Sequence, residues 1–316
     1  MIAVVFPGQG SQKRGMGQGL FDEVPEYRAV EREVDALLGY SLRRLCIEDP
    51  DNRLKQTQYT QPSLYVVNAL HYYKAVSEGL RPAYVAGHSL GEYNALLAAG
   101  VFDFLSGLRL VRKRGELMSQ AQRGGMAAIV GLGAAQIAQV IQENGLASID
   151  VANFNSPSQT VISGPVADIQ RCGPLFERAG AKLYVPLPVS AAFHSRYVAD
   201  AAEQFAAFLA PLSFAAARVP VIGNVTGRPY PDGPASGAVK AMLVQQITSP
   251  VQWTQSIRCL LDAGVTEFRE LGPGNVLTRL VQDIQRDQAR SASDDIAGAE
   301  YGMRSERYHS GVAGQR

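Results

Sequence analysis

The sequence predicts an α/β fold in which a large domain with a mostly parallel sheet carries an inserted ferredoxin-like βαββαβ subdomain. Two observations predict it. In both outer parts of the chain, short buried-type strands alternate with helical patterns, which is typical of a sheet covered by helices on its faces. In the middle, residues 126–189 change to the order β-α-β-β-α-β of a ferredoxin-like unit.

The large domain is predicted to span residues 1–125 and 190–286. Its first strand is a short apolar run that stops at Pro7, and its second strand runs through a glycine turn into a helix. The predicted strands are Ile2–Phe6, Ala83–Ala86, Val219–Gly223 and Thr266–Glu270, and the predicted helices are Glu26–Leu38, Gln61–Glu78, Glu92–Ala99, Phe104–Ala121, Val239–Gln246 and Gln252–Ala263.

The small subdomain is predicted at residues 126–189, with an Asn-Ser-Pro turn between its two central strands. Its predicted strands are Met126–Leu132, Asp150–Phe154, Gln159–Ser163 and Lys182–Pro186, and its predicted helices are Ala134–Glu143 and Val166–Ala179. From Asp287 onward Ser, Ala, Asp, Arg and Gly dominate, with few large aliphatic residues. Residues 287–316 are therefore expected to form a polar tail or linker.

The composition excludes several classes of protein. The 316 residues are 46% hydrophobic and 19% charged, which indicates a folded rather than a disordered chain. The net charge of +1 predicts no general attraction for nucleic acid or an anionic membrane. No apolar run approaches the ~18 residues of a membrane-spanning helix, and the N-terminus is interpreted as a strand, not a signal peptide. Three cysteines far apart (Cys46, Cys172 and Cys259) indicate reduced thiols in the cytoplasm, and no Cys/His cluster has zinc spacing.

A G-x-S-x-G motif, Gly87-His-Ser-Leu-Gly91, joins a buried strand to a helix. Small residues are needed there because the chain reverses sharply. The turn would hold the Ser89 hydroxyl at the mouth of the sheet, beside unpaired backbone N–H groups of the helix that could bind an oxyanion. This context favours a nucleophile elbow over the alternative, an ordinary glycine-rich turn.

Four histidines could supply the base that a nucleophilic serine needs. His309 lies in the tail, His71 sits in a helix as a structural or surface residue, and His88 leaves the elbow in another direction. His194 follows a strand, at the loop end of a sheet element, where the sites of open α/β sheets gather. Elimination favours His194 as general base over a packed loop histidine. No acid stands in an obvious triad position, so a backbone carbonyl or an amide is expected to orient the imidazole.

Arg114 lies in the middle of the apolar stripe of the helix that follows the elbow, whereas Arg112 and Lys113 fall off that stripe. A buried arginine needs an anionic partner. An internal Asp or Glu would serve, and so would a carboxylate on a substrate, which guanidinium binds through two parallel hydrogen bonds. The stripe consists of Leu110, Val111, Leu117, Met118 and Ala121.

The glycine-rich turn after the first strand matches no nucleotide-binding pattern. Gly15 is followed by Met16 and not by Lys-Ser or Lys-Thr, and the third glycine of a dinucleotide fingerprint is replaced by Lys13. The turn is better explained as one that brings backbone N–H groups close to an anion. The N–H of Gln9 would then be a second oxyanion donor beside that of Leu90.

Together these features resemble the malonyl-CoA:acyl-carrier-protein transacylases of fatty-acid and polyketide synthesis. The matching motifs keep the family order from residue 1 to about 285, which makes a chance resemblance very improbable. They are Phe6-Pro-Gly-Gln-Gly-Ser-Gln12, Thr60-Gln-Pro62, Gly87-His-Ser-Leu-Gly-Glu92, Arg114-Gly115, Asn153-Phe-Asn-Ser-Pro157, Pro186-Leu-Pro-Val-Ser190, Pro250-Val-Gln-Trp253 and Glu270-Leu-Gly-Pro-Gly274.

The resemblance implies a role for each of seven residues and a hydrolase-like form for the large α/β domain. Ser89 matches the nucleophile and His194 its base, while the N–H groups of Gln9 and Leu90 match the oxyanion hole. Arg114 matches the residue that pairs with the malonyl carboxylate. Gln252 matches the residue whose backbone carbonyl orients the histidine. Phe193, before the base, is typical of malonyl-specific relatives, although Ala191 departs from the usual polyketide signatures.

The activity implied is transfer of a malonyl group from malonyl-CoA to the phosphopantetheine thiol of an acyl carrier protein, through a malonyl-serine intermediate with ping-pong kinetics. No cofactor and no metal are expected, and no nucleic acid or membrane partner. The sequence is compatible with a cytoplasmic monomer, for example a free-standing trans-acting polyketide acyltransferase, and equally with a domain of a larger synthase. Two other functions stay open: an acyl-thioester hydrolase with the same Ser-His pair, and a non-catalytic docking module for carrier protein.

Overall fold

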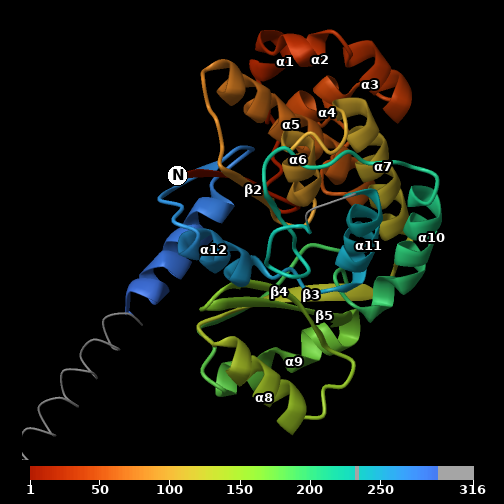
Figure 1. Cartoon of the computed structure of the whole chain (residues 1–316). Helices are drawn as coiled ribbons and strands as arrows, with labels where there is room; N and C mark the ends of the chain where they lie inside the picture. The colour runs from red at the N-terminus through yellow and green to blue at the C-terminus, as the bar shows by residue number, and fades with distance from the viewer. Residues whose placement is uncertain (232–234, 291–316) are drawn as a thin grey trace, which may run out of the picture.

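The structure, a computed structural model, describes residues 1–231 and 235–290. Its larger part is built on a parallel four-stranded sheet with the order β7-β2-β1-β8 (Figure 1). The strands are β1 (Ile2–Phe6), β2 (Tyr84–Gly87), β7 (Val221–Ile222) and β8 (Glu267–Glu270). Because all four run in the same direction, the loops after them meet at one edge of the sheet.

Both faces of the parallel sheet are buried at its inner strands β1 and β2, as the continuous apolar run of β1 predicts, whereas the edge strand β8 is partly exposed. Val4 and Phe6 pack into the larger core, whereas Ala3 and Val5, on the opposite face, belong to a second core. The larger core is formed with α5 (Thr57–Ser77), α6 (Gly91–Ala98), α7 (Phe104–Gln120), α10 (Ala199–Leu209) and α11 (Ala235–Thr248), and the second with α12 (Trp253–Asp262) and a helical segment from residue 276 to 290.

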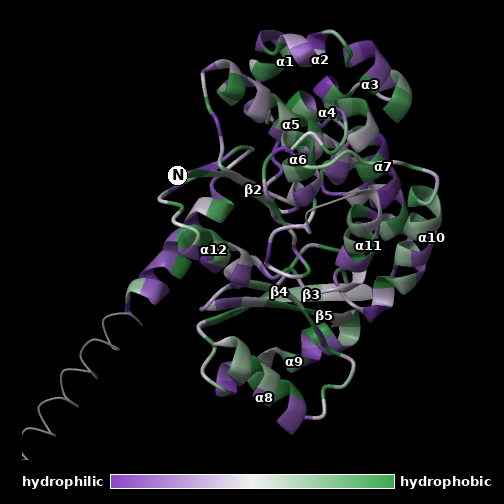
Figure 2. Cartoon of the chain, in the orientation of Figure 1, coloured by the Kyte–Doolittle hydropathy of each residue, from purple (hydrophilic) through white to green (hydrophobic). Residues whose placement is uncertain are grey.

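The smaller part is an antiparallel sheet with the order β4-β5-β3-β6, which confirms the ferredoxin-like unit. Its elements are β3 (Gly124–Val130), α8 (Ala134–Glu143), β4 (Asp150–Ser156), β5 (Gln159–Pro165), α9 (Val166–Arg178) and β6 (Leu183–Pro186). Both helices cover one face, over an apolar core that includes Ile129, Ile162 and Phe176. Figure 2 shows that α8 carries both hydrophilic and hydrophobic residues, as a helix with one buried side should.

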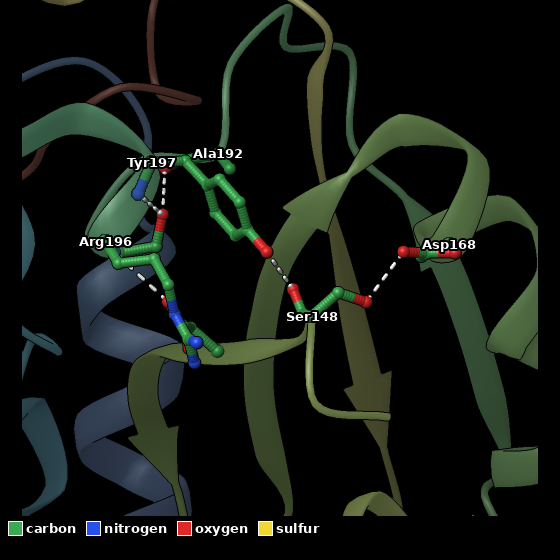
Figure 3. Close-up of polar contacts among 7 residues, drawn as sticks. Ser148, Asp168, Ala192, Arg196 and Tyr197 are labelled. Carbon is green, nitrogen blue, oxygen red and sulfur yellow. Dashed lines mark hydrogen bonds and ion pairs between the residues drawn. The ribbon is translucent and has the colours of Figure 1, made fainter. Parts of the chain in front are cut away.

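Several contacts tie the two parts together. The Phe154 N–H of β4 donates to the Val251 carbonyl (2.9 Å), and Val251 N–H donates to the Ala152 carbonyl (2.9 Å). At the start of β4, Arg196 forms an ion pair with Asp150. Figure 3 shows this contact region, where the Tyr197 hydroxyl also donates to the Ser148 carbonyl (2.9 Å). Arg196 begins a short 3₁₀ helix, η1 (Arg196–Val198), so these contacts anchor the segment that contains His194.

The predicted helix Glu26–Leu38 is wrong as a single element. It consists of α2 (Pro25–Arg28) and α3 (Glu31–Leu38), because Val30 leaves the helical conformation (φ −123°, ψ 5°). Further helices were not predicted: α1 (Leu20–Glu23), α4 (Leu42–Glu48), α10 and the segment 276–290. The first two are about one turn or two long, too short for a periodic pattern to stand out.

The predicted tail at 287–316 falls mostly outside the described residues. Its first four residues, 287–290, continue the helical segment instead of leaving it, and Arg258 forms an ion pair with Asp287 (2.8 Å). Within the described ranges, none of the helices combines the length and the apolar character needed to cross a membrane.

Candidate active site

Ser89 lies at the sharp turn between β2 and α6, as the G-x-S-x-G motif predicts. Its backbone has a positive φ of 51°, a conformation that costs a non-glycine residue about 1–3 kcal/mol. The flanking glycines are required sterically. A Cβ at Gly87 would lie 1.9 Å from the carbonyl carbon of Gly91, and one at Gly91 would lie 2.0 Å from the carbonyl oxygen of Phe6. The strained turn therefore depends on tight packing against β1.

The Ser89 Oγ lies 2.8 Å from the His194 Nε2. The ring is 4% exposed, and its Nδ1 lies 2.9 Å from the Gln246 carbonyl oxygen and 3.2 Å from that of Ser249. Carbonyl oxygens only accept, so Nδ1 carries the proton and Nε2 is free to accept the serine proton. This is the geometry of an activated nucleophile and its base.

The expectation that the Gln252 carbonyl orients the histidine is wrong. Gln252 is the N-cap of α12, and its carbonyl accepts from the N–H of Ser256 (2.9 Å) and from the Ser256 hydroxyl (2.9 Å). Gln246 instead lies in the last turn of α11, where carbonyls have no partner within the helix. The negative end of the helix dipole there also favours an N–H donor. The predicted type of contact, a backbone carbonyl, is present, but another residue supplies it.

Burial and a neighbouring cation keep the imidazole neutral. Desolvation is the larger cause and the positive charge of Arg114 the second; together they lower the pKa of His194 to about 3. A neutral imidazole is the form that can accept the proton of Ser89.

The two predicted oxyanion donors lie beside this pair. Gln9 and Leu90 both line the cavity that contains Ser89 and His194. Within residues 1–231 and 235–290, the backbone N–H groups of Gln9 and Leu90 have no hydrogen-bond acceptor, while the N–H of Ser89 is already bound to Asn224 Oδ1 (2.6 Å). Two unpaired N–H groups in one cavity can bind a developing oxyanion.

Arg114 is 1% exposed and reaches the same cavity. Its Nη2 donates to Ser89 Oγ (3.2 Å) and Gln246 Oε1 (3.0 Å), and its Nη1 donates to Gln61 Oε1 (2.9 Å). All these acceptors are neutral, and the Nε has no partner in the described chain. The direct internal ion pair that the sequence left open is therefore absent from the residues described, so the guanidinium is open to a carboxylate on a substrate.

The cavity itself has a volume of about 100 Å³ and lies between the two sheets. A cavity of this size has room for several water molecules or for a short acyl group. The small subdomain contributes Met126 and Asn153 to its wall, and Phe193 lines it from the loop before His194. His88 also lines it, but its ring binds Asn155 Oδ1 (2.8 Å) and not Ser89, in agreement with its exclusion as the base.

Sequence reasoning assigned no role to four buried polar residues around the pair: Gln61, Glu92, Asn224 and Gln246. Gln61 and Glu92 stand inside motifs that the resemblance singled out, so a signal for them existed. Asn224 and Gln246 are 135 and 157 positions from Ser89 in the chain, and no local pattern marks them. Among the described residues, no group of three or more His, Cys, Asp or Glu side chains is arranged to hold a metal ion.

Comparison with known proteins shows which family the chain resembles in sequence and fold. The family model described as "Acyl transferase domain" matches residues 3–305. The chain is 52% identical over 295 residues to the polyketide biosynthesis malonyl CoA-acyl carrier protein transacylase BaeC of Bacillus velezensis, covering 92% of this chain and 99% of BaeC. It is also 52% identical over 290 residues to the polyketide biosynthesis protein ThaF of Burkholderia thailandensis, covering 92% of this chain but only 24% of ThaF.

Two solved structures are similar over 90% of the chain. The malonyl CoA-acyl carrier protein transacylase of Burkholderia pseudomallei has a TM-score of 0.84 and 50% identity, over 98% of its own chain. A malonyl-transacylase solved in complex with a type II polyketide-synthase acyl-carrier protein, PlMCAT:AntF, has a TM-score of 0.83 and 37% identity, over 92% of its chain. With the Ser-His pair and the buried arginine in place, the chain belongs to the family of malonyl-CoA:acyl-carrier-protein transacylases.

Proposed function

We propose that this protein transfers a malonyl group from malonyl-CoA to the phosphopantetheine thiol of an acyl carrier protein, through a malonyl ester on Ser89. The observation that carries the proposal is the contact of Ser89 Oγ with both the His194 ring (2.8 Å) and the Arg114 guanidinium (3.2 Å). The first contact activates a nucleophile. The second brings a cation that has no ion-pair partner among the described residues to the place where a small dicarboxylic acyl group would lie.

In the first step, Ser89 Oγ attacks the thioester carbonyl of malonyl-CoA while its proton passes to His194 Nε2. The carbonyl electron pair moves onto the oxygen, which the N–H groups of Gln9 and Leu90 stabilise, a contribution of about 3 kcal/mol per donor in comparable sites. The tetrahedral intermediate then collapses. The carbon–sulfur bond breaks, His194 returns the proton to the departing CoA sulfur, and a malonyl ester remains on Ser89.

The second step repeats the first with a different nucleophile. The phosphopantetheine thiol of the carrier protein gives its proton to His194 and attacks the ester carbonyl, and Ser89 leaves with that proton. Arg114 pairs with the free carboxylate of the malonyl group throughout, which fixes its orientation. The proposed reaction uses no cofactor, because the thioester itself supplies the activated acyl group.

We place the reaction in polyketide biosynthesis in the cytoplasm. The relative BaeC, named for polyketide biosynthesis, supports the first part. Three free cysteines, two of them buried, support the second, since they are compatible with a reducing compartment. The complex of a similar transacylase with a carrier protein supports an acyl carrier protein as acceptor. Loading assays with carrier proteins of a polyketide and of a fatty-acid synthase would compare the two pathways directly.

The test is intact-mass analysis of the full-length protein after brief mixing with malonyl-CoA. We expect a mass gain of one malonyl group, its absence in Ser89→Ala, and its disappearance when holo carrier protein is added, with the malonyl group recovered on the carrier. Rapid release of free malonate without carrier protein would instead show an acyl-thioester hydrolase. Absence of any acyl-enzyme and of any turnover would show a non-catalytic docking module.

A further inference from the structure

The carboxyl group of Glu92 is fully buried beneath the elbow, in the first turn of α6, and no step of the proposed reaction uses it. Three donors surround it. The Tyr230 hydroxyl (2.5 Å) and the Asn224 backbone N–H (3.3 Å) donate to Oε1, and the Gln246 Nε2 donates to Oε2. These three hydrogen bonds make the carboxyl group an integral part of the buried structure, because each donor left unpaired would destabilise the fold.

The side-chain amide of Gln246 lies between Glu92 and Arg114. Its Oε1 accepts from Arg114 Nη2 (3.0 Å), and its Nε2 donates to the Ser89 carbonyl (2.9 Å) and to Glu92. Guanidinium can only donate, and the Ser89 carbonyl can only accept. The amide therefore satisfies its neighbours in one orientation only, with its oxygen toward the arginine. A flipped amide would place N–H against N–H at Arg114.

In this orientation the neutral amide of Gln246 lies between the carboxyl group of Glu92 and the guanidinium of Arg114. A carboxylate in direct contact would stabilise the buried guanidinium but would also occupy the donors that a substrate needs. Although Gln246 lies between them, the ionised Glu92 carboxylate still compensates the cation through space, while the Arg114 Nε has no partner among the described residues and the Nη2 faces Ser89. The arrangement keeps a buried cation stable and open to a substrate carboxylate.

We propose that Glu92 is a positioning residue: it fixes the amide of Gln246 and thereby keeps Arg114 available to select acyl groups that end in a carboxylate. This inference rests on the proposed transfer of malonyl groups. Tyr230 and Asn224 hold the carboxyl group from the side opposite Gln246, and Asn224 in turn holds the Ser89 N–H. Glu92 thus links the nucleophile turn with the substrate cation.

The first test is the ratio of malonyl to acetyl loading on Ser89, measured by intact mass after equal times with each CoA thioester. In Glu92→Gln, the new NH₂ group must face either Gln246 Nε2 or the Asn224 N–H, and both are donors. We expect the malonyl-to-acetyl ratio to fall by about tenfold or more, because the amide of Gln246 loses one of the three partners that fix its orientation. An unchanged ratio would overturn the inference.

The second test exchanges the two side chains in Glu92→Gln/Gln246→Glu. The double variant keeps the net charge and nearly the same side-chain volumes, so it tests the inference even if the single variant does not fold. It moves the carboxylate into direct contact with Arg114. We expect the protein to fold and the ratio to stay low, because an internal ion pair now occupies the cation. A ratio restored to the native value would show that Glu92 acts only through stability and would overturn the inference.

Glu270→Gln is the matched control. Glu270 also accepts three hydrogen bonds, from Leu277 N, Thr278 N and the Thr278 hydroxyl, but it does not line the cavity of Ser89. It should lower the melting temperature without lowering the malonyl-to-acetyl ratio; a loss of ratio as large as in Glu92→Gln would overturn the inference. Malonyl loading of the native enzyme distinguishes failure of the proposed function from failure of this inference. If the native enzyme loads no malonyl group, both fail. If it loads malonyl selectively while Glu92→Gln and Glu92→Gln/Gln246→Glu keep the native malonyl-to-acetyl ratio, only this inference fails.

Discussion

The two sheets of the molecule bury different kinds of residues. The antiparallel sheet and its helices enclose an apolar core, the polar side chains that this part buries, such as Asn153 and Ser163, are uncharged, and every residue with positive φ from 124 to 186 is a glycine. At the carboxyl edge of the parallel sheet, polar side chains such as Arg114, Glu92 and Gln246 are buried together, and both Ser89 (φ 51°) and His194 (φ 56°) have strained backbones. Among the described residues, backbone strain and buried ionisable side chains thus lie together where the chemistry is, while the small subdomain forms one wall of the cavity.

Removing the base should produce the largest effect on chemistry. In His194→Asn, the asparagine tolerates the positive φ of this position, so the backbone is preserved while the base is lost. We expect the rate of malonyl loading to fall by about 10²- to 10⁴-fold, the range of general-base catalysis. Single-turnover loading followed by mass measures it. A loss below about tenfold would show that another group accepts the serine proton.

Removing the buried cation should have the next largest effect, and a selective one. Arg114→Ala should slow malonyl loading by about 10- to 100-fold, the value of hydrogen bonds to a charged group, but acetyl loading much less. The measurement is the loading rate with each CoA thioester. If both rates fall equally, Arg114 is structural and its role in selectivity is refuted.

The contact between the two parts of the molecule should matter less. Asp150→Asn removes the charge that holds Arg196, two residues after His194, on β4 (Figure 3). The pair is exposed on the arginine side, so we expect a small change in the loading rate, within about threefold, that shrinks further in high salt. A loss comparable to that of His194→Asn would mean that this contact alone holds the base in place.

The pH dependence should lack the titration of an ordinary histidine. An imidazole with a pKa near 6.5 would be about nine-tenths protonated at pH 5.5 and would lose about tenfold in rate as a base. Because the pKa of His194 is lowered to about 3, its neutral form persists as the pH falls, and loading should show no loss centred near pH 6.5. Burial raises the pKa of Glu92 to about 7, so a change centred near pH 7 that vanishes in Glu92→Gln belongs to that carboxyl.

The core of the small subdomain should affect stability but not chemistry. Phe176 in α9 is fully buried and stacks on Tyr184 (ring centroids 5.9 Å apart). Phe176→Ala should lower the free energy of unfolding by about 3–5 kcal/mol, measured by chemical denaturation. The loading rate per folded molecule should be unchanged at low temperature. A large loss of loading rate in molecules that are still folded would show that the core of the small subdomain also contributes to the chemistry.

The fold class and the nucleophile could be predicted because their signals are local. Alternating strands and helices mark the sheet, and the spacing of Gly87, Ser89 and Gly91 marks the elbow, since only glycine fits against β1. Arg114 could be found because it interrupts an apolar stripe. The break between α2 and α3 and the unpredicted α10 show the limit of this reasoning, because tertiary packing overrides weak periodicity.

The sequence by itself determined which residues can attack, accept a proton and bind a carboxylate. Only the tertiary structure decided which groups hold them. The carbonyl that orients His194 comes from Gln246 and not from Gln252. Gln246 lies in the last turn of α11, where its carbonyl has no partner within the helix, whereas Gln252 begins α12 and its carbonyl already accepts from Ser256. Gln246, Asn224 and Glu92 meet beneath the elbow from two helices and one loop, and no spacing along the chain encodes that meeting.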